Sequence, residues 1–144
     1  MTNSPSASIV SYEDYENAIR QVREAVFIEE QGVSREDEFD GFDNRCLHAA
    51  AFDVAGTLVG TGRLDPEKDG KIGRVAVLAS HRRQGLGRQL MQSLETEAER
   101  IGLKQVWFHA QVSAVPFYEA LGYQAEGEEF LEANIRHVKM RREF

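Results

Sequence analysis

Apolar residues recur every three or four positions in two stretches of the chain, and each stretch predicts an amphipathic helix. The longer stripe covers residues 86–101, where the leucines fall one turn apart, and Gly102 follows at a position that often ends a helix. The other stripe begins after Ser11, which can cap a helix, and is expected to end by Gly32. A third and shorter helix is predicted over residues 114–121.

Runs of β-branched and aromatic residues between these stripes predict strands. They cover residues 47–52, 57–64, 72–78, 105–110 and 135–140, with a further extended segment from Tyr123. The first three follow one another through short turn-rich connections, which predicts an antiparallel meander. A helix separates the next two, and such a crossover predicts that they lie parallel. We therefore expect an α+β protein with three α/β/α layers around a mixed sheet, and disorder over residues 1–7.

Composition narrows this picture mainly by exclusion. The 144 residues predict one domain over 1–144, and the formal net charge of −7 argues against a general nucleic-acid surface. No apolar run reaches the length of a membrane span. The N-terminus, MTNSPSASIV, lacks the basic and apolar regions of a signal peptide, so a cytoplasmic location is expected. The single cysteine, Cys46, excludes a disulfide framework, and the four histidines are too scattered to predict a metal site.

The stretch GRVAVLASHRRQGLGR, residues 73–88, predicts an anion-binding turn between a strand and a helix. The first N–H groups of a helix have no internal partner, and the helix dipole is positive at that end. Gly85 and Gly87 let an anion approach the backbone closely. Positive charge around the turn comes from Arg82, Arg83 and Arg88. The turn lacks the endings of a P-loop and of a dinucleotide fingerprint, and we predict a phosphate cradle of another kind.

The pattern R-x-x-G-x-G directly behind a V-A-V strand resembles the acyl-CoA pyrophosphate loop of the GNAT superfamily of N-acetyltransferases. A second match is QVSAVPFYEALGY, residues 111–123, where family members often show Asn, a linker and F-Y-x-x-x-G-F. Gln111 stands where Asn is usual, and Tyr123 stands where Phe is usual. A third match joins VFIEEQGV, residues 26–33, to F-x-E-x-x-I-x-H-x-x-M over 130–140, and is similar to the ElaA-type branch.

This resemblance implies a GNAT fold, in which two parallel strands splay apart to admit acetyl-CoA as the co-substrate. In the family, the strand that matches Val75, Ala76 and Val77 pairs its backbone with the pantetheine arm. A backbone N–H near Val77 would polarise the thioester carbonyl, and Gln111 would donate an amide hydrogen bond to the arm. The pyrophosphate contacts implied by the resemblance fall on Arg82, Arg83, Gln84, Gly85, Leu86, Gly87 and Arg88.

Direct acetyl transfer to a primary amine in a ternary complex, which the resemblance implies, requires an acid and a base. Tyr118 matches the family's usual general acid and would lie near the cofactor sulfur; the alternative is a tyrosine at a helix–sheet seam with its hydroxyl satisfied. For the base we consider Glu30, His81, His109 and His137, or a water held by one of them. Glu30 alternatively pairs with the incoming ammonium. His48 and His109 alternate with apolar residues on strands, which favours a structural role for both.

The acidic segment SREDEFDGFDN, residues 34–44, has two open interpretations. Either it is a solvated loop fixed by Phe39 and Phe42, or it is a wall of the acceptor site that attracts a cationic amine of a small molecule or peptide. The chain also has a rival function, that of a non-catalytic acyl-CoA-binding sensor or assembly module. Homodimers are frequent in the GNAT family, and the sequence leaves both the oligomeric state and the acceptor open.

Overall fold

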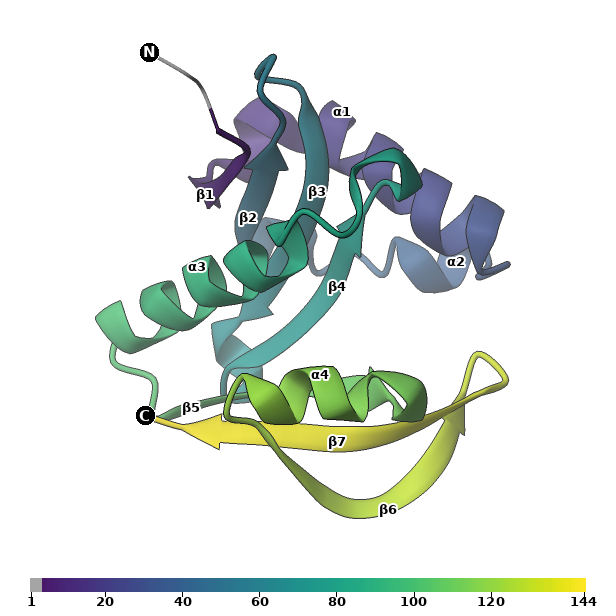
Figure 1. Cartoon of the computed structure of the whole chain (residues 1–144), viewed down its shortest axis with the longest axis vertical. Helices are drawn as coiled ribbons and strands as arrows, with labels where there is room; N and C mark the ends of the chain where they lie inside the picture. The colour runs from purple at the N-terminus through teal and green to yellow at the C-terminus, as the bar shows by residue number, and fades with distance from the viewer. Residues whose placement is uncertain (1–3) are drawn as a thin grey trace.

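The computed structural model describes residues 4–144, which form a seven-stranded sheet in the order β1-β2-β3-β4-β5-β7-β6 (Figure 1). All neighbouring strands are antiparallel except β4 and β5, which are parallel. The predicted β2–β3–β4 meander and the parallel crossover are therefore confirmed. The strands are β1 (Ser6–Val10), β2 (Leu47–Phe52), β3 (Leu58–Asp65), β4 (Lys71–Val77), β5 (Gln105–Gln111), β6 (Gln124–Glu132) and β7 (Ile135–Glu143).

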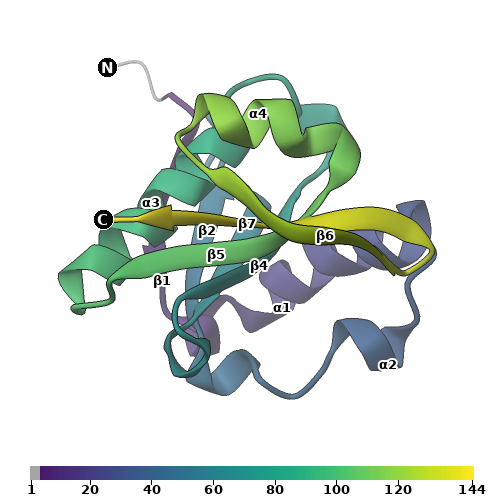
Figure 2. The ribbon, with the colours of Figure 1, turned by 90° about the horizontal axis from the view of Figure 1, so that it is seen from below.

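Helices cover both faces of the sheet, which confirms the predicted α+β layering. The α-helices are α1 (Tyr12–Arg23), α2 (Arg35–Glu38), α3 (Leu86–Arg100) and α4 (Val115–Ala120). Figure 2 shows α3 and α4 on one side of the sheet and α1 with α2 on the other. In the part of the chain that the structure describes, no helix combines the length and the apolar character needed to cross a membrane.

The N-terminal part of the chain differs from the sequence expectation in two places. Ser6 and Ala7 pair with β2, so the disorder expected over residues 1–7 is wrong for these two; residues 1–3 lie outside the described residues. The predicted first helix is α-helical only through α1 and continues as a π-helix, η1 (Glu24–Glu30). Ser11 stands at the N-terminus of α1 without a capping hydrogen bond from its side chain.

Glycines end α3 and α4 as the sequence predicts. Gly102 has a φ of +91°, and the N–H groups of the following turn close a Schellman motif on the last carbonyls of α3. Gly122 has a φ of +95°, and the N–H of Tyr123 donates to the carbonyl of Tyr118 at 3.1 Å. The backbone at the end of α4 is thereby fixed at Tyr118.

A bulge in β4 separates this strand from β5. The β3–β4 register shifts between Thr61 and Arg63, so that β4 carries one extra residue there. Arg74 lies at the bulge with a φ of +56°, a left-handed conformation that is uncommon for an arginine. β4 pairs with β5 only near the start of each strand, at Lys71 and Trp107, and the two strands then diverge (Figure 1).

The apolar stripes of the two long helices form separate cores on the two faces of the sheet. Leu86, Leu90 and Leu94 of α3 are buried in the larger cluster, which also includes residues of β4, β5 and β7. Ile19 and Val22 of α1 lie in the smaller cluster against β2 and β3. Because both cores end where β4 leaves β5, the site described next lies between them.

Candidate functional site

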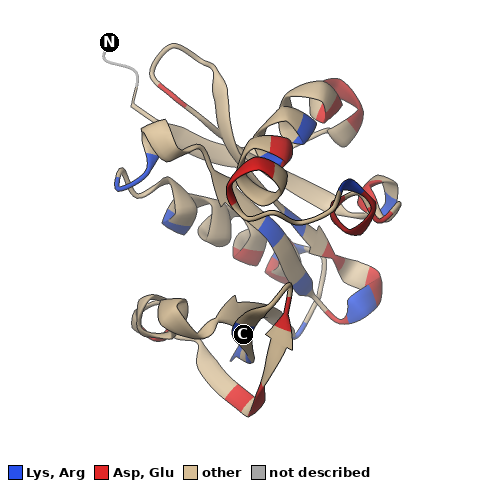
Figure 3. Cartoon of the chain, turned by 90° about the vertical axis from the view of Figure 1, so that its right-hand side faces the viewer, with Lys and Arg blue, Asp and Glu red and all other residues tan. Residues whose placement is uncertain are grey.

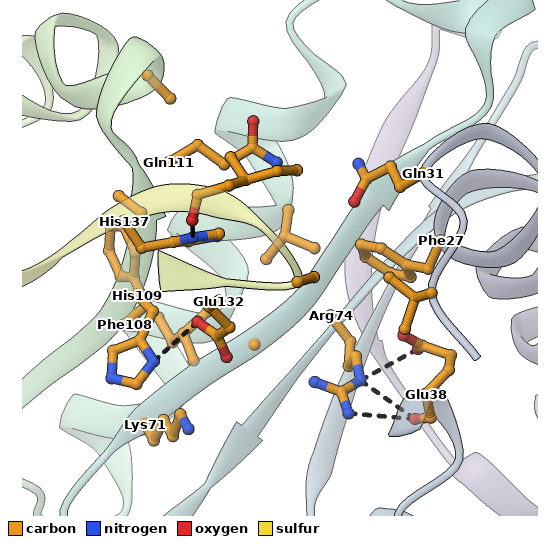
Figure 4. A pocket seen from close by; sticks show the side chains of 18 of the residues that line it. Phe27, Gln31, Glu38, Lys71, Arg74, Phe108, His109, Gln111, Glu132 and His137 are labelled. Carbon is orange, nitrogen blue, oxygen red and sulfur yellow. Dashed lines mark hydrogen bonds and ion pairs between the residues drawn. The ribbon is translucent and has the colours of Figure 1, made fainter. Parts of the chain in front are cut away.

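A cavity of about 440 Å³ lies where β4 and β5 diverge. Phe108 and Tyr118 line it from β5 and α4, and both belong to or pack against the larger core. Phe27 and Gln31 line it from η1 and the residue after it, and His137 lines it from β7 (Figure 4). Residues from both faces of the sheet therefore meet in one cavity.

The turn between β4 and α3 is exposed over residues 82–85. Gly85 has a φ of +78° and stands at the start of α3, whose first N–H groups have no side-chain cap. Within residues 4–144, neither Arg83 nor Arg88 has an acidic group within 4 Å. A methyl group added at Gly87 would meet no atom within 4 Å apart from the neighbouring residues and the nearby backbone of α3, so space for an anion remains at the first turn of this helix. These features fit the acyl-CoA pyrophosphate that the sequence predicts here.

Arg82 and Glu30 bind each other at the edge of this turn. The Arg82 Nη2 lies 2.9 and 3.0 Å from the two Glu30 carboxylate oxygens, and its Nε donates to the Val77 carbonyl at 2.9 Å. The pair ties the end of η1 to the end of β4. Glu30 is not among the residues that line the cavity, so the structure does not bring it together with Tyr118 or His137.

The edge of β4 that faces β5 has no strand partner beyond Lys71 in the described chain. Of the three residues expected to contact pantetheine, Val75 lines the cavity and Ala76 and Val77 do not. The last two pair with β3 on one edge of β4, and the opposite edge has no strand partner there in the described chain. Gln111, the last residue of β5, points into the cavity (Figure 4). An unpaired strand edge and a side-chain amide thus lie beside the same space.

Tyr118 lines the cavity from the last turn of α4. Its ring packs on Phe108 with the ring centroids 4.5 Å apart. Burial raises the pKa of the Tyr118 phenol, so the hydroxyl stays protonated at neutral pH. No hydrogen bond from another residue between 4 and 144 reaches this hydroxyl. The alternative that the sequence left open, a tyrosine at a helix–sheet seam with a hydrogen-bonded hydroxyl, is therefore not what the structure shows.

Two histidines line the cavity, each held through Nδ1. The His137 Nδ1 lies 2.7 Å from the Ile135 carbonyl oxygen, which can only accept, so Nδ1 carries the hydrogen and Nε2 is the ring nitrogen that can accept one. The His109 Nδ1 lies 3.2 Å from the Glu132 carboxylate, and burial lowers the pKa of His109 despite this neighbour. His109 thus has a hydrogen-bond partner, as expected of a structural histidine, and it also lines the cavity. His48 is buried with its ring bonded to the Asp43 carbonyl, which agrees with the structural role predicted for it.

The acidic segment is largely an ion-pair network. Arg23 is 0% exposed and lies 2.8 Å from Glu38 and 2.7 Å from Asp43. Arg63 lies 2.9 Å from Asp43 and 2.5 Å from Asp40. Burial opposes ionisation of both aspartates, but the arginine hydrogen bonds outweigh it and lower both pKa values. Glu38 and Asp43 are therefore not solvated, whereas the first interpretation of the sequence expected a solvated loop. They are also not free to attract an amine, whereas the second interpretation expected this.

Sequence reasoning missed two cations that line the cavity, Lys71 and Arg74. It places Arg74 in a regular buried strand, because a bulge leaves no periodic signal in a single sequence. The only available signal was Gly73, since a glycine within a strand often marks a bulge. Elsewhere the charges of both signs are interspersed along the chain (Figure 3). No group of three His, Cys, Asp or Glu side chains suited to a metal ion occurs among residues 4–144.

Comparisons with known proteins agree on one family. Residues 13–144 match the model described as an acetyltransferase (GNAT) domain. The uncharacterized N-acetyltransferase YjcF of Bacillus subtilis is 41% identical over 121 residues, which cover 83% of this chain and 86% of YjcF. An acyl-CoA N-acyltransferase from Pseudomonas aeruginosa is 33% identical with a TM-score of 0.84, covering 96% of this chain and 99% of that one. Escherichia coli ElaA is 29% identical with a TM-score of 0.81, covering 97% and 99%.

Proposed function

This chain belongs to the GNAT acetyltransferase family, and we propose that it transfers an acetyl group from acetyl-CoA directly to a primary amine of a small molecule or peptide. The observation that carries the proposal is the divergence of β4 from β5, which leaves an unpaired strand edge beside a cavity, while the chain continues from β4 through an exposed turn into α3. Acetyl-CoA supplies the acetyl group as an activated thioester. The residues of the chain bind it, orient it and move two protons.

Binding would use the turn, the strand edge and one amide. The N–H groups at the start of α3 and the free guanidinium groups of Arg83 and Arg88 suit a pyrophosphate, with backbone approach at Gln84, Gly85, Leu86 and Gly87. The free edge of β4 from Val75 to Val77 suits the pantetheine amides, and Gln111 can donate to the same arm. Arg82 is already bound to Glu30 and Val77, so we assign it to holding the turn in place.

For the chemistry we assign Tyr118 as the general acid and the Nε2 of His137 as the acceptor of the amine proton, directly or through a water. The neutral amine forms the new C–N bond while the C–S bond breaks, and the Tyr118 hydroxyl protonates the departing sulfur. We leave Glu30 out of the base role because Arg82 occupies both of its oxygens. A cysteine nucleophile is not needed, and burial raises the pKa of Cys46 to about 11, which disfavours its thiolate.

Tyr118→Phe tests this assignment. We expect kcat for acetyl transfer to fall by about 10²–10⁴-fold, the usual contribution of a positioned proton donor. The Kd for CoA should stay near wild type, because the ring and its packing on Phe108 remain. Thiol release from acetyl-CoA with a broad amine panel gives kcat, and calorimetry gives the Kd. Tyr15→Phe is the matched control, since Tyr15 is 38% exposed and does not line the cavity.

Two results would change the proposal. An unchanged kcat in Tyr118→Phe would remove this residue from the mechanism. Tight CoA binding by the wild-type protein without thiol release from any amine would instead favour a non-catalytic acyl-CoA-binding module of the same fold.

A further inference from the structure

We propose that Lys71 and Arg74 form an oxyanion-binding subsite in this cavity, so that the acceptor is a small amine that also carries a carboxylate or a phosphate monoester. The inference rests on the proposed acetyl transfer and narrows its acceptor class. Both residues line the cavity that Tyr118 and His137 also line.

Arg74 is a fixed cation with one side free. Its Nε donates to the Glu38 carbonyl at 3.2 Å and lies 3.1 Å from the Glu38 carboxylate. Its Nη2 donates to the Asp37 carbonyl at 3.0 Å and lies 3.3 Å from the Asp40 carboxylate. Its Nη1 has no acceptor in the described part of the chain. In Figure 4 the bonded side of the guanidinium faces Glu38, and the opposite side faces the part of the cavity where Lys71 and Glu132 lie. An arginine held in this way presents a donor that is already oriented toward a ligand.

Lys71 is a cation without a carboxylate partner. No acidic group of residues 4–144 lies within 4 Å of its Nζ, which instead lies 5.3 Å from the centroid of the Trp107 ring. Burial lowers the pKa of Lys71, and nearby Lys68 acts in the same direction. An anion bound next to this ammonium would favour its charged form, so the site gains from a ligand of negative charge.

The bulge in β4 brings the two cations together. In a regular strand, residues three apart point to opposite faces of the sheet. The left-handed conformation of Arg74 accommodates the extra residue, and the side chains of Lys71 and Arg74 consequently line one cavity. Such a conformation is strained for an arginine, and strain of this kind is concentrated at binding and catalytic sites.

The carboxylates that line the cavity are arranged to suit a zwitterion. Glu38 is paired with both Arg23 and Arg74, and Glu132 is paired with His109. Asp37 lines the cavity and has no basic group within 4 Å in the described chain. The free Asp37 carboxylate, the Lys71 ammonium and the remaining donor group of Arg74 lie in one space and match a molecule that carries both an ammonium and an oxyanion. They do not match the purely cationic amine that the acidic composition of residues 34–44 suggested.

The test compares amines in pairs that differ in the anion. Phosphoethanolamine is compared with ethanolamine, and β-alanine with β-alaninamide, by kcat/KM for thiol release from acetyl-CoA. We expect the anionic member of at least one pair to be preferred by about tenfold or more, as for a charge-assisted hydrogen bond. The pair with the larger preference shows whether the oxyanion is a phosphate or a carboxylate. Lys71→Met keeps the apolar stem and should reduce that preference about tenfold.

Lys139→Met is the matched control. The Lys139 Nζ also lies over the Trp107 ring, 4.7 Å from its centroid, but Lys139 does not line the cavity. This variant should therefore keep the wild-type preference. Equal kcat/KM values within both pairs, or the same loss of preference in both lysine variants, would overturn the subsite.

Calorimetry with protein saturated with CoA separates the subsite from the chemistry. A Kd preference for the anionic amine that Lys71→Met abolishes, without thiol release from any amine, would retain the subsite and reject acetyl transfer. Thiol release from neutral amines without any anion preference would reject the subsite and retain acetyl transfer. If the protein shows neither a Kd preference nor thiol release, both the subsite and acetyl transfer are rejected.

Discussion

At the scale of single residues, the wall of the cavity depends on Arg23. Its side chain is fully buried and donates to the Glu38 carboxylate, the Glu38 carbonyl and Asp43. The same stretch of backbone offers the Asp37 and Glu38 carbonyls to Arg74. One guanidinium on α1 therefore holds the segment against which the proposed oxyanion-binding arginine is fixed.

Replacing Arg23 by Met should destabilise the fold strongly. Breaking a buried ion pair leaves its partners uncompensated, and the free energy of unfolding should fall by about 3–5 kcal/mol. Arg35→Met is the control, because the exposed Arg35–Glu24 pair should contribute less than about 1 kcal/mol. Urea unfolding measures both changes. Equal losses in the two variants would show that burial of Arg23 does not strengthen its contribution.

At the scale of elements, the start of α3 contains two glycines, and a different physical factor favours glycine at each position. Gly85 has a positive φ, which an L-residue adopts only with strain. Gly87 lies within the first turn of α3, where a Cβ would meet no protein atom apart from the neighbouring residues and the nearby backbone of this helix. Nothing inside the protein requires glycine at position 87, whereas an anion at the helix start would lie close to its backbone.

Gly87→Ala should therefore separate stability from binding. We expect the free energy of unfolding of the ligand-free protein to rise by about 0.5–1 kcal/mol, because alanine has the higher helix propensity. The rise in Tm caused by CoA should become smaller, because the new methyl group occupies the approach to the backbone. Thermal unfolding with and without CoA measures both effects. An unchanged shift by CoA would place the pyrophosphate elsewhere.

At the scale of the whole molecule, the ion-pair network joins α1, α2, β3 and β4 and makes the fold sensitive to acid. The pKa values of Asp40 and Asp43 are lowered on folding, so their contribution is present above the unfolded pKa of about 4 and is lost as pH falls through the folded values. Burial raises the pKa of Glu38, whose contribution has the opposite sign and is lost as pH rises through its folded value. Because two carboxyl groups have lowered pKa values and only one has a raised value, the free energy of unfolding should decrease below about pH 4.

Urea unfolding at pH 7, 5 and 3 tests this balance. The free energy of unfolding should change less between pH 5 and pH 3 in Asp40→Asn than in the wild type, because one of the lowered carboxyls no longer titrates. Glu36→Gln is the control, since Glu36 forms no ion pair with other residues between 4 and 144. A pH dependence in Asp40→Asn equal to that of the wild type would exclude Asp40 as a source of the acid sensitivity.

The features that the sequence predicted are local ones. The stripes of α1 and α3, the stops at Gly102 and Gly122 and the turn at Gly85 are each encoded within about one helical turn. The features it could not predict join distant segments. Arg82 meets Glu30 from 52 positions away, and Glu38, Asp40 and Asp43 are paired with arginines of α1, β3 and β4. Composition alone cannot show which charges neutralise one another.

The single pairing between Lys71 and Trp107 has a mechanical consequence. In the described chain, the sheet has a four-stranded part, β1-β2-β3-β4, and a three-stranded part, β5-β7-β6. This one position is the only place where strands of the two parts are paired. Away from this position, the larger core packed beneath α3 joins the two parts through side chains that come from both. We therefore expect the two parts of the sheet to separate more readily at the end where the cavity lies than at the Lys71–Trp107 end.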